Sequence, residues 1–151
     1  MKLLSLCAVM LGLVTGLGFA APRPADKDDK DDAKKFLGEW MITKWEQAGF
    51  AQDQDTLDSS KWTFEKDKYI FDLGGNMEEG ELKLDPKAKT PTLDLIIKTG
   101  NDAGKEQPGI YKIEGDTITV CMAMPGVKER PTEFSSTQEN RQIVAVLKKK
   151  K

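Results

Sequence analysis

The sequence of 151 residues contains no histidine. Histidine is the side chain that most often acts as a general base near neutral pH, and it is the commonest metal ligand. Its absence excludes the Ser-His-Asp and Cys-His arrangements of nucleophilic enzymes and argues against a zinc enzyme. No glycine-rich phosphate loop precedes a helix either. We therefore expect no enzyme, no metal site and no cofactor.

Cysteine is scarce, since the chain has only Cys7 and Cys121. Cys7 lies in an N-terminal segment that we expect to be removed, which leaves Cys121 without a partner for an internal disulfide. The folded chain must therefore be stabilised by its apolar core.

Basic charge is not in excess. The chain has 23 lysines and arginines against 25 acidic residues, a formal net charge of −2. Because binding to phosphates requires a basic surface, this balance argues against nucleic acid as a partner.

The clearest targeting signal is at the N-terminus. Lys2 precedes an apolar run from Leu3 to Phe19, and the small residues Gly18 and Ala20 suit a signal peptidase. We predict a signal peptide over residues 1–20 and an exported protein, either periplasmic, in the cell envelope or secreted. An apolar run of roughly 19 residues is also long enough to remain as an uncleaved anchor. After cleavage, no integral membrane domain is expected.

The next segment, residues 21–35, consists almost entirely of Asp, Lys, Ala and Pro. Such a composition buries little apolar area, so we predict a disordered charged linker. The remaining residues, 36–149, form the expected folded domain.

In this domain, short stretches of alternating apolar and polar residues are separated by turn residues such as Gly74-Gly75-Asn76. We count eight strands, and only 53–60 could hold a helical turn. The expected strands lie at about 38–48, around 62–64, at 69–73, 77–84 and 93–97, around 110–113, and at 118–124 and 142–147. The predicted fold is all-β, an eight-stranded antiparallel up-and-down barrel, because closure removes the exposed edges of a sheet.

Several motifs point to a family. Gly38-Glu39-Trp40 resembles the Gly-x-Trp signature of lipocalins at the start of the first strand. The ordered set is Leu37-Gly38-Glu39-Trp40, Gly80-Glu81-Leu82-Lys83-Leu84-Asp85, Pro108-Gly109-Ile110-Tyr111, Gly115-Asp116-Thr117, Cys121 and Glu129-Arg130-Pro131-Thr132-Glu133-Phe134. Together they resemble an exported, lipocalin-like small domain found in many copies in planctomycete bacteria, a largely uncharacterised family. The resemblance covers residues 36–149. It implies a lipocalin-like barrel and export, but it transfers no ligand or catalytic residue.

The resemblance also implies a contact that closes the barrel. In lipocalins, an arginine near the last strand packs on the tryptophan of Gly-x-Trp. Here that tryptophan is Trp40, and the arginine is Arg130 or Arg141. We expect Arg130, because the Arg130 to Phe134 run fits the family pattern, and the contact would be a cation–π pair.

The inward faces of the strands are apolar and aromatic. The predicted ligand-binding residues are Trp62, Phe64, Tyr69, Phe71, Leu82, Leu95, Tyr111, Val120 and Met122. An eight-stranded barrel either fills with such side chains or admits one small ligand. Two functions follow: a non-enzymatic barrel that binds a small apolar ligand, or a cell-envelope structural or protein-interaction module with a filled core. A cavity would distinguish them, whereas an enzyme would need polar residues that converge inside the barrel.

Overall fold

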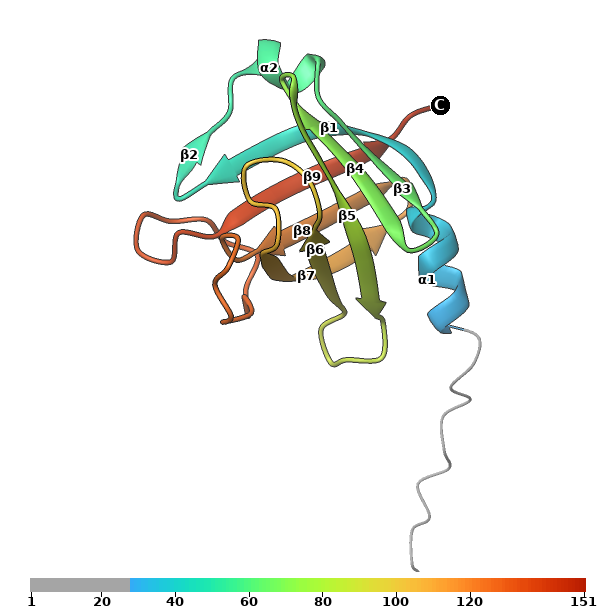
Figure 1. Cartoon of the computed structure of the whole chain (residues 1–151). Coiled ribbons are helices and arrows are strands. Elements are labelled where there is room, and N and C mark those ends of the chain that lie inside the picture. The colour runs from blue at the N-terminus through green and yellow to red at the C-terminus, as the bar shows by residue number, and fades with distance from the viewer. Residues whose placement is uncertain (1–27) are drawn as a thin grey trace, which may run out of the picture.

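The protein folds as a closed β-barrel (Figure 1). The computed structural model describes residues 28–151. The elements in this range are α1 (Asp28–Phe36), β1 (Gly38–Gln47), β2 (Phe50–Ala51), α2 (Gln54–Asp58), β3 (Lys61–Glu65), β4 (Lys68–Leu73), β5 (Asn76–Asp85), β6 (Thr92–Ile97), β7 (Glu106–Glu114), β8 (Thr117–Met122) and β9 (Ile143–Lys149). Strands β1 and β3 to β9 pair antiparallel in chain order, and β1 also pairs with β9, which closes the sheet. The expected all-β, eight-stranded antiparallel barrel is confirmed.

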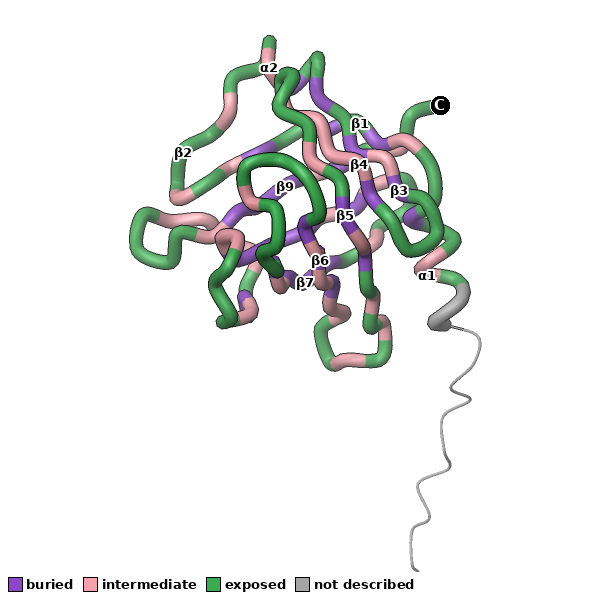
Figure 2. The backbone as a smooth tube through the Cα atoms, in the orientation of Figure 1, coloured by how far each residue is buried: buried purple, intermediate pink, exposed green. Residues whose placement is uncertain are grey.

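The strands form where the sequence alternates between apolar and polar residues. In β6, Leu93, Leu95 and Ile97 are buried, and Leu93 and Leu95 pair across the sheet with Leu84 and Leu82. Figure 2 shows that the buried segments lie along the strands, whereas the connections between them are mostly exposed. The helical turn expected within 53–60 is present as the helix α2, whereas the two-residue β2 was not predicted.

A bulge in β1 changes which residues face the interior. The register between β1 and β9 shifts between Ile42 and Lys44. Thr43 lies at this shift and donates a hydrogen bond from its hydroxyl to the carbonyl of Val146 at 3.1 Å. Trp40 and Trp45 are an odd number of residues apart, so regular alternation would place them on opposite faces of the strand. Because a bulge adds one residue, both are buried.

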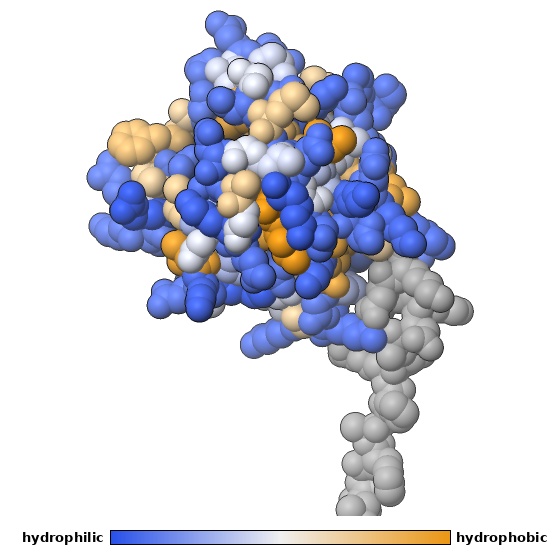
Figure 3. Space-filling view, viewed as in Figure 1, coloured by the Kyte–Doolittle hydropathy of each residue, from blue (hydrophilic) through white to orange (hydrophobic). Residues whose placement is uncertain are grey.

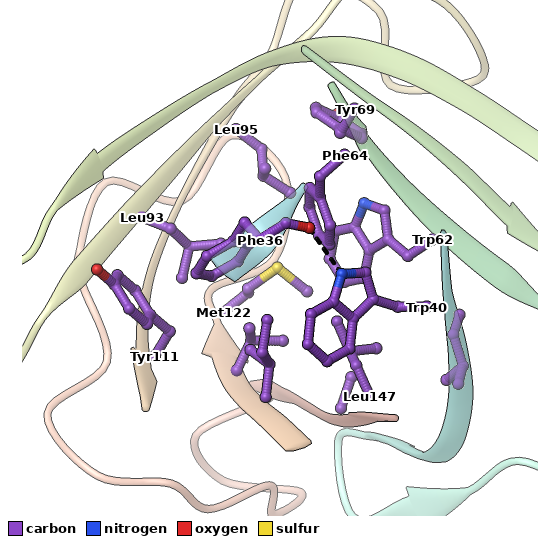
Figure 4. Close-up of a cluster of buried hydrophobic side chains, with 14 of the residues drawn as sticks. Phe36, Trp40, Trp62, Phe64, Tyr69, Leu93, Leu95, Tyr111, Met122 and Leu147 are labelled. Atoms are coloured by element: carbon purple, nitrogen blue, oxygen red, sulfur yellow. Dashed lines mark hydrogen bonds between the residues drawn. The ribbon is translucent and has the colours of Figure 1, made fainter. Parts of the chain in front are cut away.

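One end of the barrel is closed by the residue that ends α1. Phe36 is 1% exposed, and its ring meets the rings of Phe64 and Tyr111 edge-on at centroid distances of 5.1 and 5.0 Å. The indole nitrogen of Trp40 donates a hydrogen bond to the carbonyl of Phe36 at 2.7 Å (Figure 4). The hydroxyl of Tyr111 donates to Asp32 at 2.9 Å, which ties the helix to β7. We call this end, where β1 begins, the closed end.

The predicted disorder of the linker 21–35 is wrong for residues 28–35, which lie in α1. The composition predicted disorder because the segment has little to bury, but Phe36 anchors the helix in the barrel. Lys149 of β9 also donates from its ammonium group to the carbonyls of Lys35 and Leu37 at 3.4 and 2.5 Å. A cation at this position suits the negative end of the helix dipole. The predicted signal peptide, 1–20, and residues 21–27 lie outside the described residues.

The predicted contact between Trp40 and Arg130 is also wrong. The cation over the Trp40 ring is the ammonium of Lys149, 4.9 Å from the ring centroid. Arg130 lies on the outside of the barrel, where it donates to the carbonyls of Leu93 and Gly109 at 3.1 and 2.8 Å and pairs with Asp94 at 2.8 Å. It therefore fastens the long connection between β8 and β9 to strands β6 and β7.

That connection covers a second apolar cluster on the outer face of the barrel. Cys121, which is fully buried, packs there with Ile110, Val144 and the half-buried Phe134. Burial raises the pKa of the Cys121 thiol. A buried thiol of this kind has little thiolate character and little reactivity.

None of the helices within residues 28–151 combines the length and the apolar character required to cross a lipid bilayer.

Replacing Phe36 by alanine is expected to lower the free energy of unfolding by about 3 to 5 kcal/mol, the usual cost of deleting a buried phenylalanine ring. The neighbouring Leu37→Ala variant is the control, because Leu37 is exposed, and a change within about 0.5 kcal/mol is expected. Urea denaturation followed by circular dichroism measures both. Equal losses would show that the burial of Phe36 does not stabilise the closed end.

Candidate functional site

The end of the barrel opposite α1, which we call the open end, holds a cavity of about 180 Å³. Its apolar walls are Trp45, Trp62, Phe71, Leu95, Met122 and Ile143, and its polar residues are Gln47, Glu78, Asp102 and Gln107. Leu73, Met124 and Pro125 complete the lining. These residues come from the ends of strands and from two connections at the open end. The closed end of the barrel is thus filled, whereas the open end holds this cavity.

The structure divides the predicted ligand-binding residues into two groups. Trp62, Phe71, Leu95 and Met122 line the cavity. The other five do not line it and are buried in the core: Phe64, Tyr69, Leu82, Tyr111 and Val120. Figure 4 labels Phe64, Tyr69 and Tyr111 among the core side chains. The prediction of one pocket lined by all nine is therefore wrong. Strand alternation predicts whether a side chain points into the barrel, but not how far along the barrel axis it lies. The five residues that do not line the cavity are packed in the core, and Phe36 fills the closed end.

Three aromatic rings form one wall of the cavity. The rings of Trp45 and Phe71 are stacked with centroids 5.1 Å apart and planes at 30°. The ring of Trp62 meets that of Phe71 at 5.0 Å and 61°. The buried indole nitrogen of Trp62 has no hydrogen-bond partner among the described residues. A buried donor of this kind costs free energy.

Sequence reasoning missed Trp45, because strict alternation from Trp40 gives it an outward face. A tryptophan on the solvent face of a strand is unusual, and this was the available sign of the bulge. The sequence prediction also omitted Glu78, although Glu78 and the inward-facing Leu82 are four residues apart in β5 and so lie on the same face of the strand. Asp102 comes from the β6–β7 connection and Gln107 from the start of β7, and no pattern in the sequence indicates that these two segments meet at one site.

Glu78 is held in place by Tyr69 and Gly80. The hydroxyl of Tyr69 donates a hydrogen bond to Glu78 at 2.7 Å. Tyr69 pairs across the sheet with Gly80, where an added Cβ would lie 2.7 Å from the Tyr69 ring and 2.2 Å from the carbonyl oxygen of Ile96. Glycine is therefore required at position 80, because only a residue without a side chain lets the Tyr69 ring cross the strand towards Glu78.

Burial raises the pKa of the Glu78 carboxyl above its usual range, and the charge of Asp102 raises it further, while the hydrogen bond from Tyr69 lowers it. Burial and the bond to Glu78 raise the pKa of the Tyr69 hydroxyl, so Tyr69 remains a donor. Raised pKa values in a cleft are typical of functional sites.

The other polar groups of the cavity have partners. Asp102 pairs with Lys105 at 2.6 Å, and the side-chain amide of Gln107 donates to the carbonyl of Ala123 at 2.8 Å. Within residues 28–151, no three acidic or cysteine side chains gather in a way that could hold a metal ion.

Comparison of the chain with protein-family models, curated proteins and solved structures finds no match.

The Glu78→Gln substitution is expected to raise the thermal unfolding midpoint at pH 7. The pKa of Glu78 is higher in the folded state than in the unfolded state, so ionisation of Glu78 destabilises the fold. This loss of stability begins as the pH rises above the unfolded-state pKa, about 4.3 for a glutamate. It is complete once the pH exceeds the folded-state pKa. The advantage of the variant should therefore shrink as the pH falls towards 4. Differential scanning calorimetry between pH 4 and 8 measures it.

The matched control is Glu79→Gln, because Glu79 is the exposed neighbour of Glu78 on the same strand. Its unfolding midpoint should follow that of the unchanged protein at every pH. A Glu78→Gln variant that did the same would contradict the assigned cost of ionising Glu78.

Proposed function

We propose that this protein is a non-enzymatic binding protein that holds one small ligand in the cavity at the open end of its barrel. The observation that carries the proposal is the cavity itself, about 180 Å³ in a barrel whose other half is filled. An apolar cavity of about 150 Å³ holds a benzene molecule. The cavity therefore suits a ligand about the size of a single ring.

The lining of the cavity supports binding rather than catalysis. Its walls are mostly apolar and aromatic, which is typical of sites that bury a ligand. Among the described residues that line it, none carries a hydroxyl, thiol or amine, and its two carboxylates, Glu78 and Asp102, are engaged by Tyr69 and Lys105.

The cavity also favours this function over that of a filled structural or interaction module. Figure 3 shows a mainly hydrophilic surface in this view, with apolar residues in separate patches. A protein-docking surface would be expected to gather its exposed apolar residues in one larger patch.

We also propose that the protein works outside the cytoplasm, in the periplasm, in the cell envelope or as a secreted protein. This proposal depends on the apolar run from Leu3 to Phe19 and the small residues that follow it. Edman sequencing of the mature protein from its own cells would give an N-terminus near Ala21 if the segment is a cleaved signal peptide. An N-terminus at Met1 would contradict the cleavage.

The test of ligand binding is a panel of single-ring compounds: tert-butylbenzene, benzyl alcohol, benzoate and phenyltrimethylammonium. We expect at least one to bind the full mature chain, measured by calorimetry and by ligand-detected NMR. The Leu73→Trp variant should weaken that binding by a factor of about ten or more, because the half-buried Leu73 lines the cavity and a larger side chain there takes up its volume.

Met77→Trp is the matched control, since Met77 lies in the next strand of the same hairpin but is 57% exposed. It should bind the ligand as the unchanged protein does. If no compound of the panel binds, or if both variants bind equally well, the cavity is not a ligand site. Native mass spectrometry before and after organic extraction is an independent test of ligand binding. A ligand retained from the cell would appear as a mass that is lost on extraction.

A further inference from the structure

The charged residues that line the cavity are both acidic. Glu78 and Asp102 line it, and no lysine or arginine does so among the described residues. Asp102 is compensated by Lys105, whose ammonium lies 2.6 Å from it. Glu78 has the Tyr69 hydroxyl as its partner and forms no ion pair within residues 28–151. The cavity therefore contains one carboxylate whose charge no protein cation balances.

Glu78 shares the cavity with three aromatic rings. The rings of Trp45 and Phe71 stack, and Trp62 meets Phe71 at an angle, so that the wall has rings in two orientations. The faces of aromatic rings carry negative charge density and attract cations, and aromatic cages are a common means of binding quaternary ammonium groups. The carboxylate and the aromatic rings around this small cavity therefore both favour a cationic ligand.

A neutral or anionic ligand fits this site less well. Glu78 is half-buried, and a buried carboxylate without a compensating cation is costly. A neutral ligand would exclude water from Glu78 without replacing its solvation, and an anion would add repulsion from both carboxylates. A cation offsets the charge of Glu78 while its apolar groups contact the rings.

We propose that the ligand of this cavity is a small organic cation, a ring-sized alkylammonium or quaternary ammonium compound, with Glu78 as its counterion and the rings of Trp45, Trp62 and Phe71 as the wall that receives it. This inference rests on the proposed binding function and specifies its ligand class.

The test compares two probes of the same shape, phenyltrimethylammonium and tert-butylbenzene, which differ in the positive charge. Selectivity is the dissociation constant of the neutral probe divided by that of the cation, measured by calorimetry on the full mature chain. Glu78→Gln should lower the selectivity by a factor of at least ten, because it removes the counterion and keeps the shape and the acceptor for Tyr69. Glu79→Gln, whose side chain is exposed, should leave it unchanged.

A second variant tests the aromatic wall without altering charge. Phe71→Leu keeps an apolar side chain at a half-buried position and removes one ring. It should weaken phenyltrimethylammonium binding by a factor of about three to ten and change tert-butylbenzene binding less. This variant also covers the case in which Glu78→Gln does not fold.

The outcomes separate the two proposals. If tert-butylbenzene or benzoate binds in the cavity and the selectivity of Glu78→Gln stays within a factor of two of the unchanged protein, the cation proposal is overturned and the binding function stands. If no probe binds, the binding function itself has failed.

The affinity for phenyltrimethylammonium should also fall as the pH is lowered. The probe has a permanent charge, so the change must come from the protein. The titratable and charged groups that face the site are Glu78 on β5, Tyr69 on β4, and Asp102 and Lys105 in the β6–β7 connection. Because a cation favours ionised Glu78, protonation of Glu78 weakens binding. Calorimetry between pH 4 and 8 should show this slope in the unchanged protein and a shallower one in Glu78→Gln; equal slopes would overturn the role of Glu78.

Discussion

The insertion of Phe36 between Phe64 and Tyr111 determines how the rest of the barrel is organised. It fills the closed end, it holds a highly charged helix that has little else to bury, and it receives the hydrogen bond from Trp40. Because an eight-stranded barrel has a narrow interior, this ring takes up the space at the closed end. The cavity lies at the opposite, open end.

The sequence allowed the barrel to be predicted because its strands alternate clearly and its turns contain glycine. Leu93, Leu95 and Ile97 illustrate this, since their spacing alone gives the buried face of β6. The helix α1 could not be predicted in the same way, because its stability comes from Phe36 and Lys149, contacts that join the two ends of the described domain. Lys149 also occupies the position over Trp40 that the family resemblance assigned to Arg130. Both lysine and arginine supply a cation, so the pattern of residues does not distinguish them.

The candidate site was partly predictable. Strand alternation correctly places four lining residues inside the barrel: Trp62, Phe71, Leu95 and Met122. It does not show that Tyr111 and Val120, which also point inward, lie away from the cavity. Glu78 has the parity of the core and was overlooked because a carboxylate is expected on the solvent face. Trp45 depends on a one-residue bulge, which reverses the face of every later residue in its strand. Local irregularities of this kind are the places where a functional site departs from the regular pattern.

The pairing of β1 with β9 has a consequence for the way in which the chain reaches its folded state. The first and last strands of the barrel are neighbours, although residues such as Leu37 and Lys149 are 112 positions apart in the chain. Contacts of such high sequence separation slow folding, since a long loop must be closed before they form. During synthesis the sheet keeps two open edges until the final strand has left the ribosome. Until β9 pairs with β1, these edges remain open to pairing with other chains and expose the protein to aggregation.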